Sequence, residues 1–142
     1  MNIKIFEYIA QAIKNITSLC NKLVDAGDAE KYAQGVQSLN ESVDETYAKM
    51  REVILNDNTL TSDQKLERLE KIANSQVSAR QTCEEAIKGN RENISKIVGD
   101  VLLVAATCGL SKYIPAVRNG KAKKVKELPK GEAEQKYIEE QQ

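Results

Sequence analysis

The 142-residue chain contains no histidine and no tryptophan, and it has only one phenylalanine, two prolines and three cysteines. Histidine is the commonest general base and metal ligand at neutral pH, so its absence removes the usual basis for a catalytic or metal site. The scarcity of aromatic residues argues against a sheet, which favours aromatic and β-branched side chains. Both prolines follow residue 114, which leaves the preceding chain almost free of helix breakers. The sequence therefore predicts an all-α protein.

The three cysteines, Cys20, Cys83 and Cys108, lie far apart in the sequence, without the paired spacing of a zinc or redox site. An odd number of cysteines also argues against a disulfide framework, so we expect a reducing, cytoplasmic location. The first fifteen residues contain too much polar content for the apolar centre of a signal peptide. Cys83 precedes two glutamates, whose charge disfavours a reactive thiolate. We therefore predict no enzyme activity, no cofactor and no metal site.

Charge is balanced overall, with 21 basic and 21 acidic residues, but segment 118–130 holds six basic residues and one acid. This segment has no aromatic side chain to stack on bases, so we expect no specific nucleic-acid binding and at most a weak attraction to anionic membranes. Segment 118–142 has too little apolar content to offset its ordering entropy and is predicted to be a flexible charged tail. The candidate residues for an anionic surface are Arg118, Lys121, Lys123, Lys124, Lys126 and Lys130.

Two long segments, 3–24 and 29–56, carry apolar residues at alternating intervals of three and four, the spacing of a coiled-coil-like seam. Gly27 and Asp28 separate the two segments, since glycine ends helices and aspartate caps them. The predicted stripes consist of Phe6, Ile9, Ile13, Ile16, Cys20 and Leu23 in the first segment and Tyr32, Val36, Leu39, Val43, Thr46, Met50 and Val53 in the second.

The capping box formed by Thr61 and Gln64 predicts a third helix over residues 62–88. Its apolar stripe begins with Leu66, Leu69, Ile72 and Ala73 and, in the same phase, continues through Gln76, Arg80, Cys83 and Ile87. Gly89 and Asn90 then predict a break before a fourth helix over residues 91–112. The heptad phase crosses this break, so one continuous helix over 62–112 is the alternative, at a cost of about 1 kcal/mol for the internal glycine.

The stretch 97–110 is apolar on nearly every side of a helix and must be covered by protein or lipid. Its one charged residue, Asp100, has two interpretations. It lies at the edge of the buried stripe, where it reaches solvent or Lys96, or it pairs across the bundle with Arg80 or Gln76. The second interpretation would explain why the middle of the third helix is polar where the fourth helix is apolar.

Together these patterns predict an antiparallel four-helix bundle over residues 1–117, or a long helical hairpin if the last two helices are continuous. Because the second and third helices are longer than the others, we expect the hairpin around residues 53–66 to project from the bundle. The stripes are narrow, so we expect homo-oligomerisation through the first or second helix to cover the remaining apolar surface.

The most plausible function is a non-enzymatic helical module that binds another protein through a helix face, in the manner of a small inhibitor, immunity or adaptor protein. The alternative is a membrane-associated protein, peripheral or single-span at the inner face of the membrane, that uses the apolar helix 97–114 and the basic segment 118–130. The uninterrupted apolar run is only ten residues long, which suits a buried helix better than a membrane span.

Overall fold

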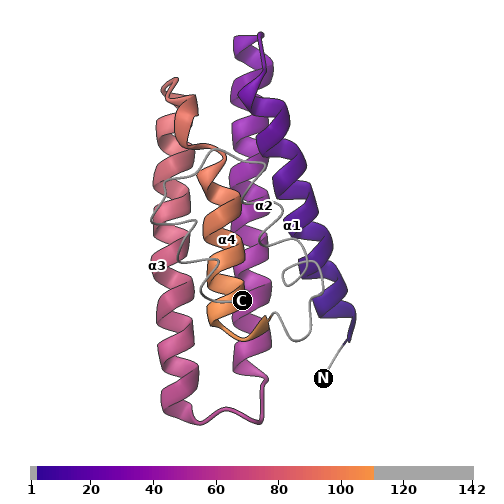
Figure 1. Ribbon diagram of the computed structural model, residues 1–142, viewed down its shortest axis with the longest axis vertical. Coiled ribbons are helices and arrows are strands. Elements are labelled where there is room, and N and C mark those ends of the chain that lie inside the picture. Colours follow the sequence, from indigo (N-terminus) through magenta and orange to yellow (C-terminus); the bar gives the residue numbers. More distant parts are fainter. Residues whose placement is uncertain (1–2, 111–142) are drawn as a thin grey trace.

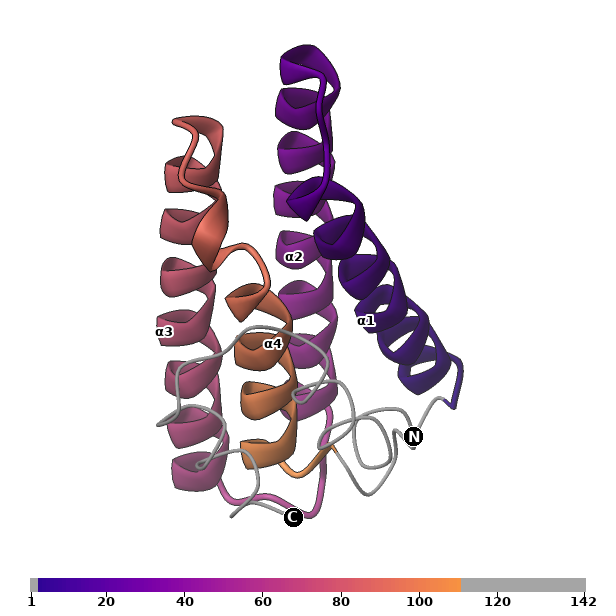
Figure 2. The ribbon, with the colours of Figure 1, turned by 45° about the horizontal axis from the view of Figure 1, so that its top comes forward.

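The computed structural model describes residues 3–110, which form an all-α bundle with no strand within that range (Figure 1). The helices run alternately up and down, so neighbours in sequence are antiparallel. Helix α2 packs along α1 and α3, and α4 packs against α3 and α1 (Figure 2). The predicted tail, 118–142, lies outside the described residues. The elements are α1 (Ile3–Val24), α2 (Ala29–Leu55), α3 (Ser62–Ile87), the short 3₁₀ helix η1 (Arg91–Asn93) and α4 (Lys96–Thr107).

The predicted stripes of α1 and α2 form one side of the core, and every residue of both stripes is buried. Ile9 and Ile16 of α1 and Leu39 and Met50 of α2 have no exposed surface at all. The Asp28 carboxylate accepts hydrogen bonds from two backbone N–H groups of the first turn of α2, at 2.9 and 3.0 Å. The first two helices and their tight connection are therefore set by local sequence signals.

Helix α3 is rotated relative to the prediction. Leu66 and Ile87, both expected in the core, are 66% and 57% exposed. The residues of α3 that are buried are Ile72, Ala79, Cys83 and Ala86. Three of these four side chains are small, whereas Ile72 is large and completely buried, and Leu69 packs against the core. Ile72, Leu69 and Cys83 thus follow the predicted stripe, whereas Leu66 and Ile87 do not.

A buried hydrogen bond accompanies this rotation of α3. The side chain of Tyr47 in α2 is completely buried, and its hydroxyl lies 2.5 Å from the Ser75 hydroxyl of α3. Burial of a phenol without a hydrogen-bond partner would be costly. Burial also raises the pKa of Tyr47, so the phenol stays protonated at neutral pH. The bond to Ser75 thus favours the rotation in which this hydroxyl of α3 points to Tyr47 of α2.

The break after α3 is present, so the alternative of one continuous helix over 62–112 is wrong. Gly89 has a φ of +104°, a conformation that an L side chain rarely adopts. Arg91 of η1 then donates to the backbone carbonyl of Ala26, and its guanidinium lies 4.2 Å from the centre of the Tyr32 ring. These contacts tie the turn before α4 to the connection between α1 and α2.

Helix α4 is shorter than predicted, because the expected helix over 91–112 divides into η1 and a helix of 12 residues. It ends at Thr107, followed by Gly109 with a φ of +80°. The Arg68 guanidinium of α3 donates to the backbone carbonyl of Cys108 at 2.9 Å, where the negative end of the helix dipole favours a cation.

The expected projecting hairpin around 53–66 is also corrected. Val53, Ile54 and Asp57 are buried, and Leu60 packs against the core. Asp57 caps the turn by accepting hydrogen bonds from the Thr59 backbone N–H and hydroxyl, at 2.9 and 2.6 Å. The connection between α2 and α3 is therefore part of the bundle rather than a free appendage.

The capping box of α3 provides a test of the local signals. The Gln64 backbone N–H donates to the Thr61 hydroxyl at 3.1 Å, and the Gln64 side chain accepts from the Thr61 backbone N–H at 2.8 Å. We expect Thr61→Ala to lower the free energy of unfolding by about 1 kcal/mol, measured by urea denaturation. The control, Ser38→Ala at an exposed site within α2, should change it by less than about 0.5 kcal/mol. Equal effects of the two variants would contradict this role of the cap.

Candidate functional site

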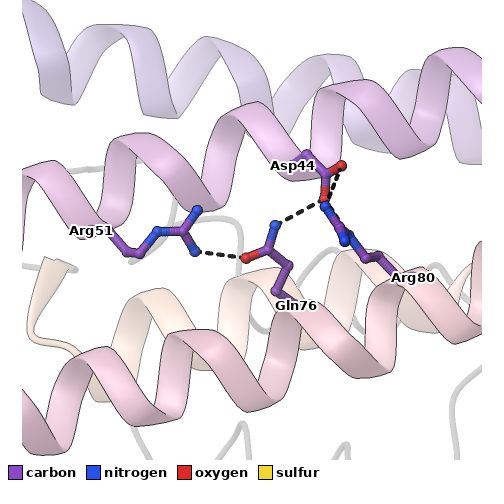
Figure 3. Close-up of polar contacts among 4 residues, drawn as sticks. All are labelled: Asp44, Arg51, Gln76 and Arg80. Atoms are coloured by element: carbon purple, nitrogen blue, oxygen red, sulfur yellow. Dashed lines mark hydrogen bonds and ion pairs between the residues drawn. The ribbon is translucent and has the colours of Figure 1, made fainter.

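A chain of polar contacts connects the outer sides of α2 and α3 (Figure 3). The Arg51 guanidinium donates to the Gln76 side-chain oxygen at 2.6 Å, and the Gln76 amide nitrogen donates to the Asp44 carboxylate at 2.9 Å. Arg80 donates to both oxygens of Asp44, from Nε at 3.0 Å and from Nη2 at 3.1 Å. Two arginines, one amide and one carboxylate thus hold the two longest helices in a single register.

Asp44 is the acceptor at the centre of this chain of contacts. Partial burial raises the pKa of its carboxyl, but the hydrogen bonds from Arg80 and Gln76 and the charges of Arg80 and Arg51 outweigh that effect, so the net pKa is lowered. The carboxylate is consequently charged at neutral pH and keeps both helices bound to it.

The predicted pairing of Asp100 with Arg80 or Gln76 is wrong. Both side chains of α3 donate instead to Asp44 of α2, on the outer side of the bundle, and Arg80 is exposed. The rotation of α3 described above is the reason, because it turns positions 76 and 80 toward α2. Asp100 and Gln76 are both half-buried, so none of these three residues is a fully buried polar group.

Asp100 lies instead in a hollow of about 370 Å³ between α3 and α4. Hydroxyl and amide groups from the middle of α3 line one side of this hollow. These polar side chains therefore face the hollow, whereas the sequence analysis explained the polar middle of α3 by a pairing of Arg80 or Gln76 with Asp100. The lining residues are Lys71, Asn74, Ser75, Ser78, Asp100, Leu103, Val104 and Thr107.

A second and larger concave surface lies between α2 and α3, beside the Asp44 contacts. It has a volume of about 630 Å³ and combines polar side chains of α2 with an apolar end formed by Ile87. Its lining residues are Ala33, Gln37, Asn40, Asp44, Arg80, Cys83, Glu84 and Ile87. Sequence reasoning missed this groove, because it depends on which face of α3 meets α2.

One exposed apolar residue of α3, Ile87, lines this groove, and two others lie farther along the same helix. Leu66, Val77 and Ile87 are 66%, 56% and 57% exposed. At 100° per residue they lie within roughly 80° of one another around the helix axis. We name the line formed by Leu66, Ala73, Val77 and Ile87 the α3 ridge; Ala73 is exposed as well. The sequence analysis identified Leu66, Ala73 and Ile87 as apolar positions of this helix, but it placed them in the core.

The thiols of α3 and α4 are poorly suited to nucleophilic chemistry. Burial, followed by the charges of Asp44 and Glu84, raises the pKa of the Cys83 thiol to about 11. Burial also raises the pKa of the Cys108 thiol. Among residues 3–110, cysteine and acidic side chains nowhere form a group of three that could hold a metal ion. In that same range, no helix has both the length and the apolar character needed to cross a membrane.

The six basic candidates between residues 118 and 130 lie outside the part of the chain that the structure describes, so their role stays a prediction. Comparisons of the chain with known protein families, with curated proteins and with solved structures find no match. The class that the fold defines is an all-α helical bundle.

The Asp44 contacts predict a pH-dependent contribution to stability. Because the pKa of Asp44 is lowered in the folded state, its contribution is present above the unfolded value of about 3.9 and is lost as the pH falls through the folded value. We expect Asp44→Asn to lower the urea midpoint at pH 7, and the difference from the parent protein to shrink steadily below pH ~4.

The matched control is Glu41→Gln, which also removes one carboxylate from α2 but at an exposed position. This substitution should leave the midpoint almost unchanged at pH 7. A difference between Asp44→Asn and the parent that is constant from pH 7 to pH 3 would contradict the role assigned to the carboxylate.

Proposed function

We propose that the protein is a non-enzymatic binding module whose docking surface is the α3 ridge together with the adjoining groove. The observation that carries the proposal is the exposure of Leu66, Val77 and Ile87 along one side of α3. A partner that covered these three side chains would remove their apolar surface from water, which favours binding.

The shape and chemistry of the ridge favour a helix as its occupant. The ridge spans residues 66–87, about 32 Å at 1.5 Å per residue, and its apolar positions are seven, four and ten residues apart on one side of the helix. Glu70, Arg80 and Glu84 lie along the same side of α3, so a matching helix would carry apolar residues flanked by charges of both signs. We propose an amphipathic helix of a protein as the partner.

The alternative, association of helix 97–114 with a membrane, has less support. The apolar residues of α4, such as Ile97, Val101 and Leu102, are buried within the bundle. They would have to leave the core before they could contact lipid. The membrane hypothesis therefore requires an opening of the bundle, whereas the α3 ridge is already exposed.

Photo-crosslinking in living cells that produce the protein tests the proposal. A photoreactive phenylalanine derivative at position 77 should give a discrete protein adduct, and the same probe at Glu41, on the exposed side of α2, should not. Adding Leu66→Glu to the position-77 probe should reduce the adduct at least tenfold, because it places a charge on the ridge. Equal adducts from both positions, or an adduct insensitive to Leu66→Glu, would refute the proposal.

A further inference from the structure

We propose that the groove between α2 and α3 is a subsite for one basic side chain, an arginine or a lysine, of the partner that docks on the α3 ridge. This inference rests on the function proposed above and adds what the partner must carry. The groove shares Ile87 with the α3 ridge, so a helix lying on the ridge can direct one side chain into the groove.

The groove begins where the polar contacts between α2 and α3 end. At one level of these two antiparallel helices, Arg80 of α3 is bound to Asp44 of α2 (Figure 3). Residues four apart lie one above the other on a helix, so Asn40 of α2 and Glu84 of α3 occupy the next level. Both of these residues line the groove, and its volume of about 630 Å³ lies within the range of ligand pockets.

Asn40 supplies a hydrogen-bond acceptor that lacks a donor. Its Oδ1 atom is buried and receives no hydrogen bond from the described residues. Such an atom destabilises the free protein, because it has lost its hydrogen bonds to water without replacement. The Asn40 side chain as a whole is only half-buried, so rotation of its terminal amide can turn the oxygen toward a ligand in the groove. A ligand that donates an N–H to this oxygen would remove the cost.

Glu84 favours a donor that carries a positive charge. Its carboxylate is exposed at the groove and forms no ion pair among residues 3–110. Lys88, one turn farther along α3, lies 3.7 Å from Glu85 instead. The other acid of the groove, Asp44, already binds Arg80 with both oxygens. One carboxylate is therefore left to attract a cation, and hydrogen bonds to a charged donor are stronger than those to a neutral one.

The rest of the lining suits the aliphatic stem of an arginine or lysine side chain. Ile87 and Ala33 provide apolar surface, and Ile87 is three residues from Glu84, about 4.5 Å along the helix axis. Either side chain can thus cover Ile87 with its methylene groups while its charged tip reaches Glu84 and Asn40. Burial, with the charges of nearby acids, raises the pKa of the Cys83 thiol to about 11, so this lining group is uncharged at neutral pH.

Titration of the full chain with blocked amino acids tests the subsite without a partner. The probes are the Nα-acetyl methylamides of arginine and lysine, and the control is the same derivative of citrulline, which has the shape of arginine without its charge. At constant ionic strength, a basic probe should shift the NMR signals of the Asn40 side-chain amide and of the Glu84 and Ile87 backbone amides until they saturate. The citrulline derivative should bind at least tenfold more weakly. Equal binding of the control, or no saturable shift with either basic probe, would overturn the proposal.

Substitutions of Asn40 separate a role in recognition from a role in folding. Asn40→Leu replaces an acceptor that lacks a donor by an apolar group, so it should raise the urea midpoint of the free protein. The same variant should bind the basic probe at least tenfold more weakly. Asn40→Asp, which places a carboxylate at this position, should bind the probe more tightly than the parent does. Unchanged probe affinity in both variants would contradict the role assigned to Asn40.

The charge of the groove is tested by Glu84→Gln, which should weaken binding of the basic probe at least tenfold. Its matched control is Glu41→Gln, which removes the same charge from an exposed position of α2 that does not line the groove. The control should change the affinity less than twofold, and circular dichroism checks that both variants remain folded. Equal losses in the two variants would indicate a general attraction to an acidic surface and overturn the subsite.

The photo-adduct at position 77 distinguishes a failure of this subsite from a failure of the proposed function. If the partner places a basic side chain in the groove, Glu84→Gln should reduce the adduct at least tenfold, and Glu41→Gln should not. An adduct that forms equally well in Glu84→Gln and Asn40→Leu would overturn the subsite and still support a binding module. Saturable binding of a basic probe without any adduct would refute docking on the α3 ridge, while the groove would remain a site for a basic group.

Discussion

The hydrogen bond between the hydroxyls of Tyr47 and Ser75 is the contact on which the arrangement of the bundle most depends. A completely buried phenol needs a partner, and in the observed rotation of α3 the Ser75 hydroxyl supplies it. This rotation places Gln76 and Arg80 at Asp44 and leaves small side chains such as Ala79 and Ala86 in the core. The rotation of α3 thus decides both which of its residues are buried and which of them contact Asp44.

The same rotation determines which surface is available for function. Leu66, Val77 and Ile87 of α3 lie outside the core, and the Asp44 contacts hold the Arg80 side chain beside them. A binding surface of this kind is fixed before a partner arrives, because helices rather than loops carry its residues. The proposed module would need neither catalytic groups nor a cofactor to act.

Local signals in the sequence were sufficient to predict where most of the helices begin and which faces of α1 and α2 are buried. The stripes of α1 and α2 are buried as predicted, and the caps at Asp28 and Thr61 form as their residue types indicate. Gly89 separates α3 from α4 because a positive φ suits glycine and few other residues. In each case the residues that carry the signal lie within one or two helical turns of one another. Packing against distant parts of the protein therefore does not change the outcome.

The sequence by itself thus determined the helical class, the beginnings of the first three helices and the core faces of α1 and α2. Only the tertiary structure decided the rotation of α3 and the partners of Asp44, Gln76 and Arg80. The reason is that α3 carries two weak apolar lines of similar strength, one through Ile72 and Ala79 and one through Leu66 and Val77. The choice between them depends on hydrogen bonds to residues about thirty positions away, which no local pattern contains.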